Sequence, residues 1–202
     1  MKKPAAAVAA LLALTPVLAS AGTSTWTVDA SHSRVGFAVK HLVISTVRGE
    51  FGKYEGKIVL DEADVTRSTV EAKIDVASVD TGVADRDAHL RSPDFFDAAK
   101  HPVMTFRSTK VAKAGKDALK VTGDLTLRGV TKPVVLDVAT SPEVKGMYGE
   151  TRRAFVATTK IDRQAFGLAW SKAVEAGPVV GDEVTITLEL EVTKAAPQTA
   201  AR

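Results

Sequence analysis

The strongest constraint on the fold of this chain is a repeated alternation of apolar and polar residues. From Val184 to Val192, every second residue is valine, isoleucine or leucine, and the residues between are threonine or glutamate. This period of two places the apolar side chains on one face of a β-strand and leaves the other face to water. The same period recurs from Val35 to Val39, from Val70 to Val76 and from Val121 to Leu127.

The alternating stretches predict an all-β chain whose strands follow each other closely. Turn signals separate them, among which are Gly115, Gly146 and the pair Arg128-Gly129. Short connections without a long helical pattern favour antiparallel meander pairing over parallel strands joined by helices. The expected strands cover residues 25–30, 33–42, 46–52, 54–61, 67–78, 103–113, 117–128, 131–141, 149–161 and 182–194.

Closure into a barrel accommodates this many twisting strands without leaving exposed edges. We therefore predict an antiparallel up-and-down (lipocalin-like) β-barrel of about eight strands, in which some candidate strands fuse, with short capping helices. A two-sheet sandwich is the alternative architecture. An outer-membrane barrel does not fit, because its outward face would place glutamate, lysine and aspartate side chains in lipid.

Two segments break the alternation. Residues 84–101 are rich in Asp, Ala, Leu and Arg, and Asp94 precedes Phe95 and Phe96 after a Ser-Pro pair, which is typical of a helix start. We expect one or two short helices there, lying over an end of the sheet. Residues 162–167 form the second, shorter interruption.

The first 21 residues have the pattern of a secretory signal peptide. Lys2 and Lys3 precede an apolar run from Ala5 to Leu18, and Ala19-Ser20-Ala21 fits a small-residue cleavage site. The run is too short for a spanning helix, so we expect export to the periplasm and no transmembrane segment after cleavage. The two lysines account for most of the net charge of +3. The expected organisation is a signal peptide over residues 1–21, a barrel domain over 22–194 and a flexible tail over 195–202.

The expected inward face is apolar and carries few bulky rings. Aromatic residues make up only 5% of the chain, and the inward positions are mostly Val, Ala, Ile, Leu and Gly. A barrel of about eight strands either fills its interior with side chains or encloses one ligand. Composition therefore leaves two interpretations open, a packed core and a smooth cavity for an elongated apolar guest.

Several motifs in order resemble the YceI-like family over about residues 25–193. The opening stretch runs from Trp26 to His41 (WTVDASHSRVGFAVKH). The further matching stretches are Gly49-Glu50-Phe51, Val79-Asp80-Thr81-Gly82, Arg86-Asp87-Ala88-His89-Leu90, residues 92–97, His101-Pro102, residues 123–132 and residues 161–168. The resemblance implies a bacterial periplasmic protein with a lipocalin-like barrel that binds a polyisoprenoid lipid, and an activity of binding or carrying rather than catalysis.

Candidate ligand-binding residues are those expected inside the barrel or at its mouth. They are Phe37, Val39, His41, Arg86, His89, Phe95, Phe96, Phe106, Leu125, Phe155, Phe166 and Trp170. His41 shares the parity of Val39, so it either meets a ligand head group or is a core histidine with a local partner. Arg86 and His89 would share a helix face and could bind a head group at the barrel mouth. Alternatively, Asp87 and Arg86 pin the cap to a neighbouring strand. The two phenylalanines of the cap either touch an entering chain or only seal the core.

Other kinds of site find little support. Asp29, Ser31 and His32 lie in one extended stretch without nucleophile-elbow glycines, so we expect no catalytic triad. The four histidines lack metal-ligand spacing, the chain has no cysteine, and no phosphate loop is present. We therefore expect no metal, no cofactor, and no nucleic acid as a partner.

The leading hypothesis is a periplasmic binding or carrier protein for a polyisoprenoid or another long-chain lipid, with a quinone or a prenyl phosphate among the candidate ligands. One alternative is a small lipid-modifying hydrolase or isomerase that uses His41 or His89 as its general base. Another alternative is a cargo-free, stress-related interaction protein with a filled barrel. The patterns leave open whether the chain forms a homodimer.

Overall fold

A computed structural model describes residues 22–174 and 177–196, and it confirms the closed antiparallel barrel of eight strands. Breaks divide three of the barrel strands into two pieces each. In chain order these strands are β1 with β2 (Thr23–Val28, Arg34–His41), β3 with β4 (Ser45–Phe51, Tyr54–Asp61), β5 with β6 (Thr69–Asp75, Val79–Asp80), β7 (Val103–Lys113), β8 (Ala118–Leu127), β9 (Val130–Thr140), β11 (Thr151–Asp162) and β14 (Val180–Lys194).

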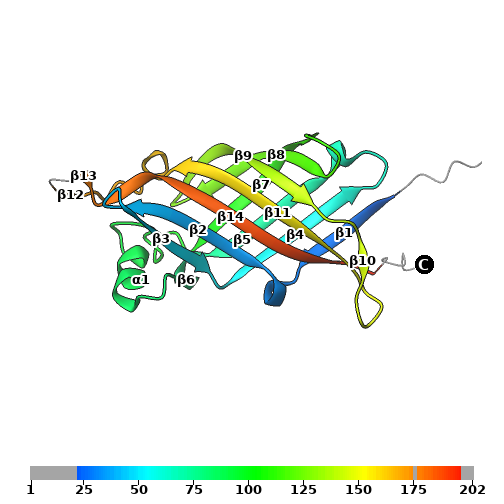
Figure 1. Cartoon of the computed structure of the whole chain (residues 1–202), viewed down its shortest axis with the longest axis horizontal. Helices are drawn as coiled ribbons and strands as arrows, with labels where there is room; N and C mark the ends of the chain where they lie inside the picture. The colour runs from blue at the N-terminus through cyan, green and yellow to red at the C-terminus, as the bar shows by residue number, and fades with distance from the viewer. Residues whose placement is uncertain (1–21, 175–176, 197–202) are drawn as a thin grey trace, which may run out of the picture.

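The last strand closes the barrel. On one edge β14 pairs with β11, from Glu183 opposite Asp162 to Thr193 opposite Arg152. On its other edge β14 pairs first with β2 and then with β1. Because every barrel strand then has a neighbour on both sides, the chain forms a ring rather than a two-sheet sandwich (Figure 1). Three short strands lie outside this ring, namely β10 (Val144–Lys145), β12 (Ala173–Val174) and β13 (Gly177–Pro178).

The expected strands match the observed ones to within a few residues, except where an aspartate starts a 3-10 turn. Residues 67–78 are not one strand, because the Asp75 carboxylate accepts a hydrogen bond from the Ala77 amide (2.9 Å) and begins η3 (Val76–Ser78). Asp29 does the same for η1 (Ala30–His32) through the Ser31 amide at 3.1 Å. The first strand therefore ends at Val28 rather than at residue 30. The third such turn is η2 (Val65–Arg67).

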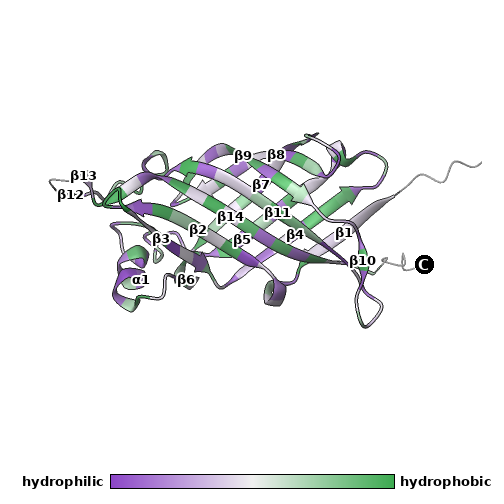
Figure 2. Ribbon diagram, viewed as in Figure 1, coloured by the Kyte–Doolittle hydropathy of each residue, from purple (hydrophilic) through white to green (hydrophobic). Residues whose placement is uncertain are grey.

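Alternation places the apolar side chains inside the barrel as expected. Most inward residues of β8 and β11 are buried, among them Val121, Leu125, Phe155 and Ala157. Bands of hydrophilic and hydrophobic residues alternate along the strands in Figure 2. The outward side chains form exposed ion pairs, for example Lys73 with Glu55 at 3.4 Å.

The segment between β6 and β7 contains one α-helix, α1 (Ala84–Arg91), and not a second one. The prediction that a helix starts at Asp94 is wrong. Instead the chain turns there, with the Phe96 amide donating to the Leu90 carbonyl (3.0 Å) and the Asp97 amide to the Ser92 carbonyl (2.9 Å). This turn buries Phe95 and Phe96 in the core, which a helix continuing away from the barrel would not do.

The two ends of the barrel differ. We call one the capped end, because it carries α1, η4 (Gln164–Phe166), the β2–β3 turn and the β8–β9 turn (Figure 1, left). The other, which we call the terminal end, carries the start of β1 and the end of β14. Residue 195, expected in the flexible tail, still donates its amide to the Thr25 carbonyl at 2.7 Å. Residues 1–21, the expected signal peptide, and residues 197–202 lie outside the described residues.

Candidate functional site: an apolar cavity in the barrel

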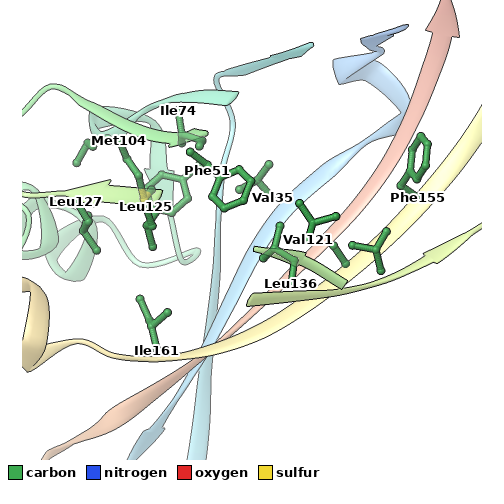
Figure 3. Close-up of a cluster of buried hydrophobic side chains, with 14 of the residues drawn as sticks. Val35, Phe51, Ile74, Met104, Val121, Leu125, Leu127, Leu136, Phe155 and Ile161 are labelled. Carbon is green, nitrogen blue, oxygen red and sulfur yellow. The ribbon is translucent and has the colours of Figure 1, made fainter. Parts of the chain in front are cut away.

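An apolar cavity of about 230 Å³ runs along the inside of the barrel. Side chains from the barrel strands line it, together with Leu90, Phe95 and Phe96 from the cap. Figure 3 shows Val35, Phe51, Leu136, Phe155 and Ile161 arranged around this space. The interior is therefore not filled by side chains, and an apolar guest is what its lining suits.

The partial exposure of the inward residues of β14 shows that the barrel interior is not fully packed. Val184, Ile186, Leu188 and Leu190 line the cavity, and both edges of their strand are paired. Yet each keeps an intermediate exposure, whereas Val121, Leu125 and Leu127 on the inward face of β8 are buried. Since these side chains face the interior, the surface they expose is surface of the cavity. One wall of the barrel thus lacks the packing partners that a closed core would supply.

Two glycines, Gly123 on β8 and Gly49 on β3, let phenylalanine rings lie close against the sheet. A β-carbon on Gly123 would lie 2.4 Å from the tip of the Phe106 ring and 2.6 Å from the Arg107 carbonyl oxygen. A β-carbon on Gly49 would lie 2.4 Å from the Phe37 ring. Both rings line the cavity, and the glycines allow them to lie over the sheet.

Few polar groups face the cavity, and most of them already have partners. The Tyr54 hydroxyl donates to the Ser33 carbonyl at 2.6 Å, and burial is the main cause that raises the pKa of this phenol. The side chains of Glu55 and Glu71, whose residues border the cavity, pair with Lys73 and Arg107 on the outer surface. A guest would consequently be held by apolar contact with little help from hydrogen bonds.

Arg163 closes the capped end of the cavity from inside the protein. Its guanidinium is 3% exposed and donates to the carbonyls of Gly181 (2.9 Å), Trp170 (2.8 Å), Val180 (3.3 Å) and Leu168, and to the carboxylate of Asp182 (2.9 Å). The pairing of β14 with β2 is irregular between Val180 and Val184, so two of these carbonyls belong to a break in the ladder. Arg163 therefore satisfies backbone groups that the broken ladder leaves without partners.

Arg128 ties the β8–β9 turn to the same end. Its guanidinium donates to the Pro93 carbonyl at 2.7 Å and to the carbonyl of Gly167. Gly167 ends η4 with a left-handed φ of 77°. Sequence reasoning missed both arginines as site-forming residues, although each lies in a motif that resembles the family. The available signal was an arginine within a glycine-containing turn at a strand end.

Seven of the twelve predicted ligand-binding residues line the cavity. They are Phe37, Val39, Phe95, Phe96, Phe106, Leu125 and Phe155. Phe166, the last residue of η4, is buried but faces a separate, shallow surface depression between β9 and β11. His41 lies at the end of β2 and is half-buried, outside the cavity lining.

Arg86 and His89 also lie outside the lining, and they contact different groups. Arg86 donates to the hydroxyl (2.8 Å) and carbonyl (2.9 Å) of Thr81, while buried Asp87 accepts from the Thr81 amide (2.9 Å) and hydroxyl (2.5 Å). These bonds pin α1 to the end of β6, as the structural interpretation of this motif predicts. The hydrolase hypothesis thus has neither His41 nor His89 at the cavity wall.

His89 belongs to an aromatic cluster on the cap. Its ring meets those of Phe95 and Trp170 edge-on, with centroids 5.0 and 5.2 Å away, and its Nε2 lies 3.0 Å from an Asp94 carboxylate oxygen. Trp170 lies 5.2 Å from Phe95, so it covers a cavity-lining ring without lining the cavity itself. The cluster forms the outer layer of the cap.

Trp26 is fully buried at the terminal end. Its indole donates to the Ser24 hydroxyl (2.8 Å), which donates in turn to Glu62 (2.5 Å). The guanidinium of Arg153 lies 5.8 Å from the Trp26 ring and 5.1 Å from the Phe155 ring. Its buried Nε has no hydrogen-bond partner among the described residues. These side chains close the end of the barrel opposite to the cap.

Asp29, His32 and Glu191 are the one group of described residues with ligand atoms close enough to hold a metal ion. Arg152 occupies the same place, with its guanidinium 2.8 Å from Asp29 and also bonded to Glu191. Hydrogen bonds from Ser31, His32 and Arg152 hold the pKa of Asp29 far below its usual range. Because the Arg152 side chain already neutralises these carboxylates, the group is explained as an ion-pair network.

The closed ring of strands, the apolar cavity and the helical cap define a lipocalin-like β-barrel that encloses an apolar cavity. A family model described as the YceI-like domain matches residues 26–192. The chain belongs to this family, as its motifs indicate.

Relatives and solved structures agree with this assignment. A UPF0312 protein of Vibrio cholerae is 34% identical over 194 residues, which cover 95% of this chain and 97% of the relative. The crystal structure of Burkholderia cenocepacia BcnA has a TM-score of 0.73 at 29% identity, covering 81% of this chain and 98% of that one. The Campylobacter jejuni YCEI protein has a TM-score of 0.68 at 34% identity, covering 78% and 90%.

A polyisoprenoid-binding domain from Saccharophagus degradans shares the fold, with a TM-score of 0.60 at 18% identity over 84% of this chain and 98% of that one. Within the described residues, no helix is both long and apolar enough to cross a membrane.

Proposed function

We propose that this protein is a periplasmic carrier that holds a polyisoprenoid or another long-chain lipid inside its barrel, without chemical conversion. The observation that carries the proposal is the cavity surface of β14, where Val184, Ile186, Leu188 and Leu190 face the interior and remain partly exposed. Membership of the YceI-like family supports it, and so does the shared fold with a domain described as polyisoprenoid-binding. The signal-like pattern of residues 1–21 supports export.

The energetics suit a long apolar chain better than a compact polar ligand. Each buried CH₂ contributes roughly 0.8 kcal/mol, so a chain of several isoprene units gains on the order of tens of kcal/mol before costs. Ordering the chain and fixing it in the protein cancel much of this gain. The remainder still supports binding without a polar anchor, which matches a lining that has few polar groups, most of them already bonded. Quinones and prenyl phosphates both carry such a chain.

A pair of tryptophan variants on one strand tests the proposal. Leu188 faces the cavity, and its neighbour Thr187 faces outward on the same strand. Protein purified from cells with their membranes is extracted with organic solvent, and the extract is analysed by mass spectrometry. We expect a long-chain lipid from the wild type and from Thr187→Trp, and less than about a tenth as much from Leu188→Trp, because the indole fills the space.

The proposal fails if the wild-type protein repeatedly yields no lipid and takes up no added isoprenoid. Equal yields from the two folded variants would also contradict it, since the lipid would then lie elsewhere. Circular dichroism and the unfolding midpoint confirm that each variant is folded before its lipid content is compared.

A further inference from the structure

The ladder between β9 and β11 is much shorter than the two strands themselves. It consists of four pairs and ends where Thr158 lies opposite Asp137, whereas β11 pairs with β14 over eleven residues. Toward the capped end, residues 130–136 of β9 and 159–162 of β11 continue as strands without pairing to each other in the described part of the chain. We call this stretch the β9–β11 seam, because ladder hydrogen bonds do not close the barrel wall there.

The β9 side of the seam lacks a backbone donor. The two-residue turn between β8 and β9 makes Leu127 and Val130 a pair that exchanges hydrogen bonds, so every second residue of β9 counted from Val130 bonds to β8. Pro133 falls between these residues, and its nitrogen, which carries no hydrogen, faces β11. Proline within a sheet is found at unpaired edges, so the sequence itself disfavours a longer ladder at this place.

Three side chains are shared by the cavity and the outer surface at the seam. A shallow depression lies over the seam, and its lining comes from both strands and from η4: residues 132–135, 159–162, Ala165 and Phe166. Val134, Thr159 and Ile161 line this depression and the cavity as well. Ile161 points into the barrel interior in Figure 3. One layer of side chains therefore separates the cavity from solvent along this stretch.

Phe166 covers the seam from η4. This 3-10 turn follows β11, contacts β9 and places the Phe166 ring, which is 2% exposed, at the depression. The turn is held locally, since the Phe166 amide donates to the Arg163 carbonyl (3.1 Å) and the Gly167 amide to the Gln164 carbonyl (2.9 Å). A short turn held by local bonds opens at a lower free-energy cost than strands within a sheet.

The two ends of the barrel are harder to open than the seam. At the capped end the Arg163 guanidinium donates to carbonyls of two separate stretches, and at the terminal end Trp26 is bonded through Ser24 to Glu62. Opening either end would leave buried donors and acceptors without partners, which is costly. Separating β9 from β11 at the seam breaks no ladder hydrogen bond and displaces apolar side chains only.

The cap fills the other place where a ladder is short. β3 pairs with β6 only at Glu50 and Phe51. There α1 is anchored through Asp87 to the Thr81 amide (2.9 Å), and the Phe96 ring packs edge-on against Phe51 with centroids 5.7 Å apart. An anchored helix thus covers that gap, whereas a three-residue turn covers the seam.

We propose that a long apolar guest enters and leaves the barrel sideways through the β9–β11 seam, which Phe166 closes. The inference rests on the proposed carrier function and adds the route to it. An apolar chain would slide between Val134 and Ile161, which face the interior from the two sides of the seam, while both closed ends keep their hydrogen bonds. Movement of η4 with its Phe166 side chain would then set the rate of uptake and release.

Tying the seam shut with a thiol cross-link tests the proposal, because the chain has no cysteine of its own. Val135→Cys with Lys160→Cys places one thiol on each strand, at exposed positions that line the depression. The matched control is Ala139→Cys with Val156→Cys, two exposed residues that lie opposite each other where the same strands are paired. Both delipidated proteins are bridged with bismaleimidoethane, and uptake of retinol, a fluorescent isoprenoid alcohol, is followed by stopped flow.

We expect the seam bridge to slow retinol uptake and release roughly tenfold or more, relative to the same variant capped with N-ethylmaleimide, because the route is blocked. The equilibrium affinity should stay the same, since the bridge lies outside the cavity. The control bridge should change neither rate. Phe166→Ala, checked for folding by circular dichroism, should take up retinol faster than the wild type, because the covering ring is gone.

The outcomes separate the route from the carrier function. Equal uptake rates in the two bridged proteins would overturn the seam as the route and assign entry to the cap or to an end, while retinol binding itself would still support the carrier function. Equal slowing by both bridges would also overturn it, since stiffening of the barrel would then be the cause. If the unmodified protein binds no retinol and no other isoprenoid, the carrier function and the route fail together.

Discussion

Replacing Arg163 with methionine should destabilise the capped end more than any surface charge change. The substitution keeps an apolar stem but removes every donor to the carbonyls of Leu168, Trp170, Val180 and Gly181. Leu168 is 5% exposed, so water does not easily replace the lost bond at its position. Each buried carbonyl left without a hydrogen-bond donor costs about 1–3 kcal/mol. Two or more such carbonyls lower the free energy of unfolding by roughly 3–5 kcal/mol.

Such a loss is a large share of the ~5–15 kcal/mol by which a domain of this kind is stable. The assay is urea unfolding followed by circular dichroism, with hydrogen exchange measured separately for residues 164–182 and for β7 and β8. The matched control is Arg107→Met, which removes an exposed guanidinium 3.5 Å from Glu71 and should cost no more than about 0.5 kcal/mol. If Arg163→Met costs no more than this control, or if exchange rises equally everywhere, Arg163 does not hold the capped end as described.

Three further perturbations follow from the same structure. Gly123→Val should lower the free energy of unfolding by about 2 kcal/mol or more, because the valine side chain would overlap the Phe106 ring and the Arg107 carbonyl. The control is Gly115→Ala at an exposed position, which should leave the free energy of unfolding nearly unchanged in the same urea titration. Asp87→Asn should loosen α1 at Thr81, seen as faster hydrogen exchange in residues 81–91 with β7 unchanged, and equal exchange in both proteins would contradict that role. The pKa of Asp29 is lower in the folded than in the unfolded protein. Its ionised carboxylate therefore contributes fully to the free energy of unfolding above pH ~5, and this contribution is lost as the pH falls. Asp29→Asn should therefore flatten the loss of stability below pH ~4, and a wild-type slope in the variant would refute this.

Alternation was enough to predict the barrel because each inward position repeats every second residue over long strands. The run from Val184 to Val192 shows why, since any shift of one residue would turn five apolar side chains outward. The positions where prediction failed are those at which a side chain bonds its own backbone. Asp75 ends a strand by bonding the Ala77 amide, and the turn at Ser92 replaces the helix expected at Asp94. Those choices depend on competing local hydrogen bonds that carry no period.

The candidate site was predictable to a similar degree. Phe106 and Leu125 lie in regular strands, and parity alone places them at the cavity. His41 shares the parity of Val39 but lies at the strand end, where the broken pairing with β14 takes it away from the lining. Arg163 was missed because its partners are carbonyls from two separate stretches, residues 168–170 and 180–181, which only the folded chain brings together. Composition did not decide whether the barrel is filled or hollow, because that depends on how the side chains pack in the folded protein.

The most direct test of a lipid-carrying barrel is a crystal structure of the protein after incubation with a long isoprenoid. The account predicts one continuous tube of density inside the barrel, in contact with Val184, Ile186, Leu188 and Leu190 and ending near the cap formed by Phe95 and Phe96. It also predicts that these β14 side chains lose their partial exposure. An interior that stays empty, or that closes around its own side chains while the isoprenoid lies outside, would contradict the account.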